Sequence, residues 1–291
     1  MTTAAGRPML GSQGAMARMF GFIGNRADLG ARVLELHTAA LNVRSEEGQT
    51  LGWGIGFYQA GEVLLRRRPI DDRPLIEIAE ATRGLRTDAM IGHVRRATVG
   101  ALRTENTHPF RYRSWLFGQT GTIQGFERLR ERLLESLPEF LRRNVRGDTD
   151  SEIFFHLFLS FLHDSGHLND ADVATEHVVA ALRSSVALVD RLSAEEGHGQ
   201  NSGDTLVTNG EQMVALHRNG GMAYRVLRGR YDIEELLGAE SRMKLKIPAV
   251  ESTHFTLIAS ELAAVPAGWT AVDGASIVTL TRTDDPLVEA I

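Results

Sequence analysis

The sequence predicts an α+β fold in which most strands pair antiparallel. The first observation is the order of the elements: strand-like apolar runs occupy residues 16–126, long helical patterns occupy 127–197, and strand-like runs return after residue 204. This segregation along the chain is typical of α+β proteins, because α/β proteins alternate strands with helices. The second observation is that glycine turns join neighbouring strand-like runs, as they do in hairpins. No proline- or serine-rich linker divides the chain, so its 291 residues predict one core.

The N-terminal strands are predicted from apolar runs that end in glycine. GAMARMFGFIG (14–24) predicts a buried first strand, and LGWGIGFYQAG (51–61) predicts a strand that alternates glycine with large apolar residues. EVLLRRRP (62–69) is the expected hairpin partner of that strand. DAMIGHVRRATVG (88–100) and SWLFGQTGTIQGF (114–126) each predict a strand that continues into a glycine-containing loop.

Three helices are expected in the middle of the chain. Residues 127–143 carry leucines at helical spacing, and Pro138 should kink or divide this helix because proline lacks the N–H that a helix needs. The apolar stretch 148–166 predicts a buried helix, and 170–197 predicts a third long helix. Three residues could cap the second of these helices: Asp148, Thr149 and Asp150.

The C-terminal third returns to strands. Four runs have the length and composition of strands, at residues 204–210, 211–218, 253–260 and 275–282. Between them, residues 227–251 are charged and mixed, which predicts a loop or lid with a short helix.

Composition narrows the possible functions. The formal net charge is −5, so there is no basic excess of the kind that nucleic-acid binding needs, and no apolar run is long enough to span a bilayer. Residues 1–15 lack the charged start and apolar core of a secretory signal, which makes the cytoplasm the expected location. We expect residues 1–15 to be a disordered leader, or an artefact of cloning or of the assigned gene start, and residues 16–291 to form a single domain.

The chain contains no cysteine. This excludes disulfides, cysteine-ligated zinc, iron–sulfur clusters and thiol catalysis. His93 and His108 could invite a metal interpretation, but neither HxH nor HExxH spacing accompanies them, and buried structural histidines are the better expectation. No metal and no cofactor are therefore expected.

Five short motifs, taken in order, resemble the class II glutamine amidotransferases. They are GWGIGFY (52–58), GHVRRATVG (92–100), ENTHPF (105–110), GQTG (118–121) and DTDSE (148–152). The stand-alone bacterial members are the most similar group, and the resemblance extends over roughly residues 16–283. It implies the four-layer αββα sandwich of N-terminal-nucleophile hydrolases, with no metal and no cofactor.

The resemblance also implies a substrate site, of which this chain retains one half. In the family, an N-terminal Cys attacks the γ-carboxamide of glutamine and the free α-amine acts as its base. Arg95 matches the Arg that grips the substrate carboxylate, for which a guanidinium fork is well suited, and Asp150 matches the Asp that holds the ammonium. A structural ion pair for Arg95 and a helix cap for Asp150 remain the alternatives. The remaining expected site residues are Thr98 and Gly121 at the substrate, with Trp53, Asn106 and His108 in support.

The reactive half of the implied site departs from the family. Ala17 occupies the nucleophile position, and Thr120 replaces the Asn that donates to the oxyanion, while Gly121 is retained. Loss of one oxyanion donor costs about 100- to 1000-fold in rate. Arg96 stands where the family often has Trp. An engineered Cys-to-Ala change could explain Ala17 but would leave Thr120 unexplained, so the pair favours a natural pseudoenzyme.

Three functions follow from this pattern. The first is a catalytically impaired protein that binds glutamine or a γ-glutamyl compound. The second is an active amidohydrolase in which water, aided by the Ala17 amine, replaces the thiol. The third is a regulatory or scaffold subunit with an empty pocket. A small-molecule ligand is expected, a protein partner or homodimer is left open, and neither nucleic acid nor membrane is an expected partner.

Overall fold

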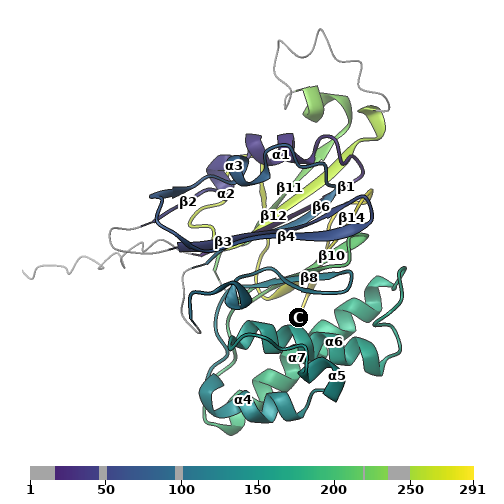
Figure 1. Ribbon diagram of the computed structural model, residues 1–291. Coiled ribbons are helices and arrows are strands. Elements are labelled where there is room, and N and C mark those ends of the chain that lie inside the picture. Colours follow the sequence, from purple (N-terminus) through teal and green to yellow (C-terminus); the bar gives the residue numbers. More distant parts are fainter. Residues whose placement is uncertain (1–16, 46–50, 96–100, 219, 235–249) are drawn as a thin grey trace, which may run out of the picture.

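Two antiparallel sheets lie face to face, and each is covered on its outer side by helices (Figure 1). This computed structural model describes residues 17–45, 51–95, 101–218, 220–234 and 250–291. Helices α1 to α3 cover the first sheet and α4 to α7 cover the second, which gives the layer order αββα. The α+β class and the four-layer sandwich predicted from the sequence are confirmed. The leader expected at residues 1–15 lies outside the described residues.

The first sheet has seven strands in the order β13-β11-β12-β1-β6-β3-β4. Strand β1 is central and pairs antiparallel with β12 on one side and β6 on the other. The strands of this sheet are β1 (Arg18–Gly24), β3 (Leu51–Gln59), β4 (Glu62–Asp71), β6 (Ala89–Arg95), β11 (Ala223–Arg228), β12 (His254–Ala259) and β13 (Thr270–Ala271).

The second sheet has six strands in the order β15-β14-β10-β9-β8-β7. They are β7 (Phe110–Tyr112), β8 (Trp115–Gln119), β9 (Thr205–Thr208), β10 (Gln212–His217), β14 (Ser276–Thr281) and β15 (Leu287–Ala290). A separate short pair joins β2 (Val43–Arg44) to β5 (Leu75–Ile76).

The helices divide into two groups. Those on the first sheet are α1 (Gly30–Leu36), α2 (Thr38–Leu41) and α3 (Ile78–Thr82), while α4 (Phe126–Glu135), α5 (Glu139–Arg142), α6 (Asp150–Asp164) and α7 (Thr175–Glu195) cover the second. Two 3₁₀ turns, η1 (Thr104–Asn106) and η2 (Val250–Ser252), complete the described elements.

The structure confirms two details of the helices that the sequence predicts. Pro138 separates α4 from α5, because its own N–H is missing and it stands at the N-cap of α5. Of the three candidate caps for α6, Thr149 occupies the N-cap, and its hydroxyl accepts the N–H of Glu152 at 3.3 Å. The phenylalanines of α6 pack into the core between this helix and the second sheet.

The prediction for residues 227–251 is wrong at its start. Strand β11 runs through Arg228, and residues 229–234 are helical, while 235–249 lie outside the described residues. The sequence did not reveal β11 because its middle residues are only half-buried, so its polar and apolar positions do not alternate cleanly. The sequence also did not predict the short elements α1, α3, β7 and β15, because each is too short to show a clear periodic pattern.

Glycines on the inner face of β3 allow the two sheets to approach. The large residues that alternate with them point outward, toward α1–α3, and join the core on that side. A Cβ on Gly54 would lie 2.1 Å from the carbonyl oxygen of His108, and one on Gly56 would lie 2.8 Å from the side chain of Leu116. The glycines of β3 therefore form a contact surface for the second sheet. Their close packing fixes the position of the chain around His108.

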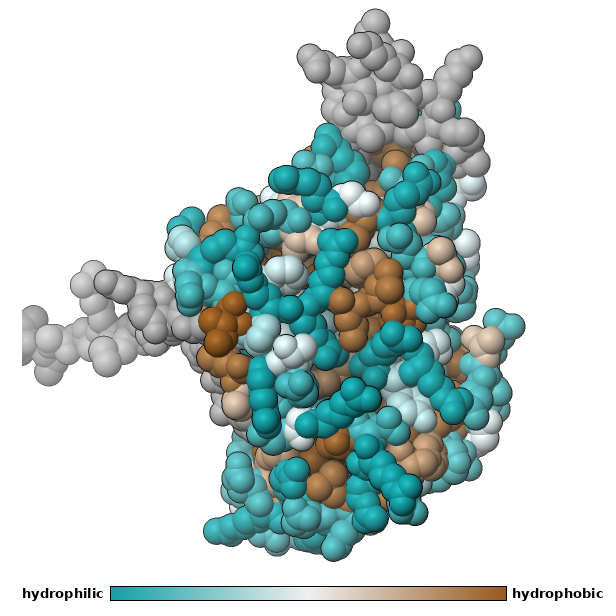
Figure 2. All heavy atoms as spheres, in the orientation of Figure 1, coloured by the Kyte–Doolittle hydropathy of each residue, from teal (hydrophilic) through white to brown (hydrophobic). Residues whose placement is uncertain are grey.

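The molecular surface is mainly polar on the face shown in Figure 2, and apolar residues form separate patches between charged ones. The exposed large apolar residues include Leu287, Val288 and Ile291 at the C-terminal end, on or next to edge strand β15. Among the described residues, no helix combines the length and the apolar character needed to cross a membrane.

We expect Gly54→Ala to destabilise the fold by about 1–3 kcal/mol, because the new methyl group would overlap a backbone oxygen that cannot rotate away. Urea unfolding measures the change. Gly199→Ala is the matched control, since its Cβ would meet no atom within 4 Å and its φ is not positive. Equal stability of the two variants would contradict the proposed close approach.

Candidate functional site

Five elements end or begin at one edge of the sandwich. Arg18 at the start of β1 pairs with Val94 near the end of β6, so the first residues of β1 lie beside Arg95. Thr120, just after β8, lies close to the Glu261 carboxyl just after β12, and Glu261 also interacts electrostatically with Arg18. Helix α6 begins at the same edge, where an Asp150 oxygen accepts the N–H of Ile123. The structure thus brings together the residue positions that the sequence assigned to one site.

Arg95 ends β6 with its side chain largely buried. Its Nη1 donates to the carbonyl oxygen of Asn106 at 2.8 Å and approaches that of Ala101 at 3.4 Å. Burial lowers the pKa of the guanidinium, and the negative charges of Asp148 and Asp150 oppose this shift. An arginine remains charged here, so the site contains a fixed cation close to two carboxylates.

Asn106 connects the loop that holds Arg95 to the loop before α6. Its Nδ2 donates to the Ala101 carbonyl at 3.0 Å and to an Asp148 carboxylate oxygen at 2.5 Å, and its Oδ1 accepts the N–H of Asp148 at 3.0 Å. Asp148 also pairs with Arg103 at 2.8 Å. These contacts are compatible with the supporting role predicted for Asn106, because both the Nδ2 and the Oδ1 of its side-chain amide form hydrogen bonds.

Asp150 is the first residue of α6 and is almost fully buried. One of its oxygens accepts the Ile123 N–H at 2.7 Å, and the other accepts the Ser151 N–H at 2.8 Å. Burial raises the pKa of this carboxyl, and the backbone donors counteract part of the rise. Asp150 therefore fastens the turn after β8 to the helix. The Ser151 hydroxyl also donates to the second oxygen at 3.4 Å, so it is the oxygen bound to Ile123 that retains a lone pair for a ligand donor.

Thr120 and Gly121 form the turn that follows β8. The Thr120 N–H donates to the Asp204 carbonyl at 2.9 Å, and its hydroxyl accepts the Asp204 N–H at 3.3 Å. Gly121 has φ of +90°, and a Cβ there would lie 2.5 Å from the Ser202 carbonyl oxygen. Only glycine fits this position, and Thr120 is held to Asp204 by two hydrogen bonds.

Glu261 is a site residue that the sequence reasoning missed. It follows β12 with φ of +58°, an uncommon conformation for a residue with a side chain, and its carboxyl is partly buried. Burial raises the pKa of Glu261, and the charge of Asp204 raises it further, whereas Thr120, Arg18 and His217 lower it. The sequence signal that could have indicated Glu261 is the polar pair Ser260–Glu261 near the end of THFTLIASEL (253–262), directly after a buried strand.

A buried carboxylate–imidazole pair lies behind this edge. His217 Nδ1 and an Asp204 oxygen are 2.9 Å apart, and the same oxygen accepts the N–H of Arg218 at 3.0 Å. Asp204 is fully buried. The pair joins the end of β10 to the start of β9. The backbone carbonyl of Asp204 also accepts the Thr120 N–H.

His93 and His108 stack on each other under the site, with ring centroids 4.3 Å apart, and His108 contacts Phe110 edge-on. His93 Nε2 donates to the Gln119 carbonyl at 3.0 Å. The expectation that His108 is buried is correct, but neither of its ring nitrogens has a hydrogen-bond partner among the described residues. Stacking and apolar burial hold this ring in place.

One expected site residue, Trp53, lies away from this edge. Trp53 is on the outer face of β3, where its indole N–H donates to Asp71 at 2.8 Å, so it supports the strand next to Arg95 from the opposite side. Thr98 and Arg96 lie outside the described residues. No cluster of three or more metal-ligating side chains occurs within the part of the chain that the structure describes.

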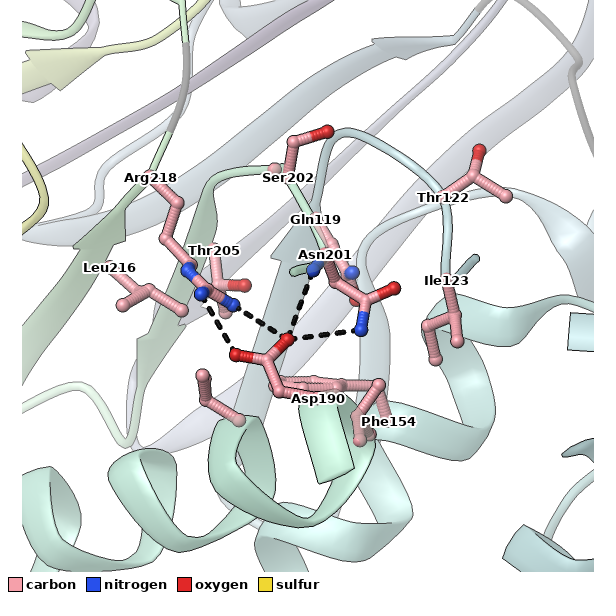
Figure 3. Close-up of a pocket in the computed structure, with 13 residues that line it drawn as sticks. Gln119, Thr122, Ile123, Phe154, Asp190, Asn201, Ser202, Thr205, Leu216 and Arg218 are labelled. Carbon is pink, nitrogen blue, oxygen red and sulfur yellow. Dashed lines mark hydrogen bonds and ion pairs between the residues drawn. The ribbon is translucent and has the colours of Figure 1, made fainter. Parts of the chain in front are cut away.

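A small pocket lies directly behind the Gln119–Gly121 turn, between the second sheet and α7 (Figure 3). Its cavity volume is about 20 Å³, which is enough for water but not for an amino acid. Asp190 projects into it from α7, pairs with Arg218 at 2.8 Å and accepts from Asn201 at 3.0 Å. Asn201 in turn accepts the N–H of Gln124 at 2.6 Å. The pocket thus ties the turn to the helical layer.

A larger cavity of about 390 Å³ opens between β4, β7 and α6, near η1. The carboxylate of Glu152 on its wall is engaged by the N–H groups of Arg146 at 3.0 Å and Gly147 at 2.6 Å. Guanidinium groups, Tyr112 and His156 supply the rest of its polar lining. None of the site residues predicted from the sequence lines either cavity.

Comparison with known sequences identifies the family. The sequence profile described as "Glutamine amidotransferases class-II" matches residues 26–286. The chain belongs to this family. It is 26% identical over 266 residues to the "Probable glutamine amidotransferase DUG3" of Saccharomyces cerevisiae, a match that covers 79% of this chain and 69% of that protein. Ala17 precedes the residues that the profile matches.

Solved structures share the fold of this class II amidotransferase family member. A glutamine aminotransferase class-II domain protein from Silicibacter pomeroyi has a TM-score of 0.57 at 18% identity and covers 94% of this chain and 98% of its own. A "predicted glutamine amidotransferase" from Pseudomonas aeruginosa has the same TM-score and identity, with coverages of 94% and 100%. At this identity, the likeness shows the fold alone.

The buried His93 predicts a loss of stability in mild acid. Burial lowers the pKa of His93 to about 4, and the Arg95 charge adds to this shift, so the unfolded chain binds a proton that the folded chain does not between about pH 6.5 and pH 4. Stability is therefore present above pH 6.5 and is lost as the pH falls. We expect His93 to lower the free energy of unfolding by about 2 kcal/mol when the pH falls from 7 to 5.

Urea unfolding of the protein and of His93→Gln at both pH values measures this contribution, because the variant should lose less stability on acidification. His163→Gln is the matched control, since it makes the same replacement at an exposed position of α6. The same pH dependence in all three proteins would show that His93 is not responsible.

Proposed function

We propose that this class II glutamine amidotransferase-like protein binds glutamine or a γ-glutamyl compound but has lost most or all glutaminase activity. The observation that carries the proposal is the absence of cysteine from the whole chain. Without a thiol, the family's nucleophile is missing, whichever residue aligns with its position. Retained ligand binding is supported by the positions of Arg95 and Asp150, which lie at the same edge within electrostatic reach of each other.

The amino-acid head of the ligand is the part that this geometry suits. A ligand α-carboxylate would bind the fixed positive charge of Arg95, and its α-ammonium would bind Asp150, whose Ile123-bound oxygen keeps a spare lone pair. Thr98 and Gly121 complete the proposed binding residues, and Asn106 positions Arg95 by accepting its Nη1 on the backbone carbonyl. His108 supports the same loop from below.

The oxyanion side supports impairment. The Thr120 hydroxyl accepts the Asp204 N–H and lies close to the Glu261 carboxyl, whose pKa it lowers, so it faces protein groups. An anionic carboxylate beside the amide carbon would also repel a developing oxyanion. Ala17, which we place at the nucleophile position, has no attacking atom, and Gly121 alone would remain as a backbone donor at the oxyanion.

We expect no measurable release of ammonia from glutamine. A thiol-dependent reaction without a thiol leaves only water as the nucleophile, and the loss of one oxyanion donor alone costs about 100- to 1000-fold. A coupled glutamate dehydrogenase assay measures the reaction, with a cysteine-bearing family member as the positive control. Turnover equal to that control, abolished by Arg95→Ala, would instead establish an active amidohydrolase of altered mechanism.

We also expect calorimetry to detect glutamine binding that weakens at least tenfold in Arg95→Ala, because a charge-assisted pair with the ligand carboxylate is removed. Arg191→Ala is the matched control, since Arg191 is exposed on α7 and its ion-pair partner is Glu195 rather than a predicted site residue. Absence of binding by the unmodified protein, for glutamine and for γ-glutamyl peptides alike, would favour a regulatory or scaffold subunit with an empty pocket.

A further inference from the structure

We propose that the larger cavity, between β4, β7 and α6, is a second ligand site that binds a small aromatic anion. Its volume of about 390 Å³ lies within the range of small-molecule sites, roughly 300–1,000 Å³. Strands β4 and β7 are each the last strand at one end of a sheet, so the cavity lies where the sandwich is open between the two sheets. None of the residues predicted for the glutamine site lines it, so this inference is independent of the proposed function.

The floor of the cavity is aromatic. Phe155 is fully buried and Phe110 nearly so, and the buried ring of His156 lies edge-on to Tyr112 and to Phe155, with ring centroids 6.5 Å and 5.7 Å apart. His156 Nδ1 donates to the Glu152 carbonyl at 2.8 Å, and burial lowers the pKa of the ring, so it stays neutral at pH 7. Aromatic rings pack favourably on one another edge-on or offset, so this floor suits a ligand ring.

The wall of the cavity carries one of the three consecutive arginines of β4. Arg66 and Arg68 are exposed, whereas Arg67 is half-buried and lines the cavity, because alternate residues of a strand face opposite sides. Arg67 Nη1 donates to the Thr104 carbonyl at 3.3 Å and Nη2 donates to the Pro109 carbonyl, while Nε is buried without a partner among the described residues. A guanidinium has five N–H groups, so two carbonyls leave donors available and the positive charge unpaired.

The charges around the cavity leave room for one more anion. Arg111 and Arg146 add two exposed guanidinium groups at the rim, and the ion pairs of the described residues include neither of them nor Arg67. The facing carboxylates are Glu105 at the rim and Glu152 on the floor, and both oxygens of Glu152 accept backbone N–H groups. Three cations therefore face two carboxylates, and a ligand carboxylate or phosphate would fit the guanidinium fork.

The order of burial orients the ligand. Its ring would lie on Phe155 and Phe110, and its anionic group would point toward the wall and the rim, where the arginines lie. Burial lowers the pKa of Arg67 to about 10, so this guanidinium has lost part of its hydration but stays charged at pH 7. A charge in such surroundings attracts an anion more strongly than a fully hydrated one does.

Ligand-observed NMR titration with benzoate, benzamide and acetate tests the proposal. Benzamide has the shape of benzoate without its charge, and acetate has the charge without the ring. We expect benzoate to bind with a Kd of about 1 mM or tighter, and the other two to bind about tenfold more weakly or less. Phenyl phosphate is titrated in parallel, and the tighter of the two aromatic anions identifies the preferred anionic group.

The variants locate the bound probe. Arg111→Gln and Arg146→Gln should each weaken benzoate binding about threefold or more, because each removes a guanidinium from the rim and keeps the backbone N–H that Glu152 accepts from residue 146. Arg44→Gln, at an exposed position of β2, is the matched control and should keep the affinity. Arg95→Ala should keep it as well, since Arg95 does not line the cavity.

Several results would overturn the proposal. Binding of neither aromatic anion would do so, and so would equal affinities for benzoate and either benzamide or acetate. A benzoate affinity that both rim variants leave unchanged, or that Arg95→Ala abolishes, would place the probe elsewhere on the protein. Glutamine binding is measured separately on the same samples, so its failure would count against the proposed function alone.

Discussion

The close contact between β3 and the loop around His108 is the constraint on which the rest of the site depends. Gly54 has no side chain, and the His108 carbonyl occupies the space that a Cβ would need. This contact sets the height of the chain from η1 to β7 above the first sheet. Asn106 lies in that segment, and its carbonyl oxygen accepts a hydrogen bond from Arg95. The position of the Arg95 guanidinium therefore depends on the absence of a Cβ at Gly54.

The second determinant is the distribution of charge along one edge of the sandwich. Arg95 interacts with Asp148 and Asp150, and the neighbouring Arg18 interacts with Glu261, which also feels the charge of Asp204. Burial raises the pKa of Asp150 and that of Glu261. Such an edge suits a zwitterionic ligand better than it suits the growth of negative charge in a transition state.

Much of the fold was predictable from the sequence because its signals are local. The alternating glycines of β3, the proline between α4 and α5, and the apolar length of α6 each determine an element without reference to the rest of the chain. Strand β11 was not predictable, because its half-buried residues depend on pairing with β12. Short β15 likewise exists only through its pairing with β14.

The candidate site was predictable in part for a similar reason. Arg95 and Asp150 follow recognisable motifs, and the structure brings them to one edge. Glu261 could not be assigned from the sequence, because its proximity to Thr120 arises from two strands that are far apart in the chain and belong to different sheets. The outward orientation of Trp53 was also hidden, since it depends on which face of β3 the glycines occupy.

The small pocket in Figure 3 has a consequence for how this edge responds to its surroundings. Asn201 connects Asp190 on α7 with the N–H of Gln124, and Asp150 on α6 holds the N–H of the preceding residue. Two helices thus restrain adjacent amides of one turn. The turn cannot open for solvent exchange without breaking bonds in the helical layer, so its rigidity is a property of the whole layer rather than of its own few residues.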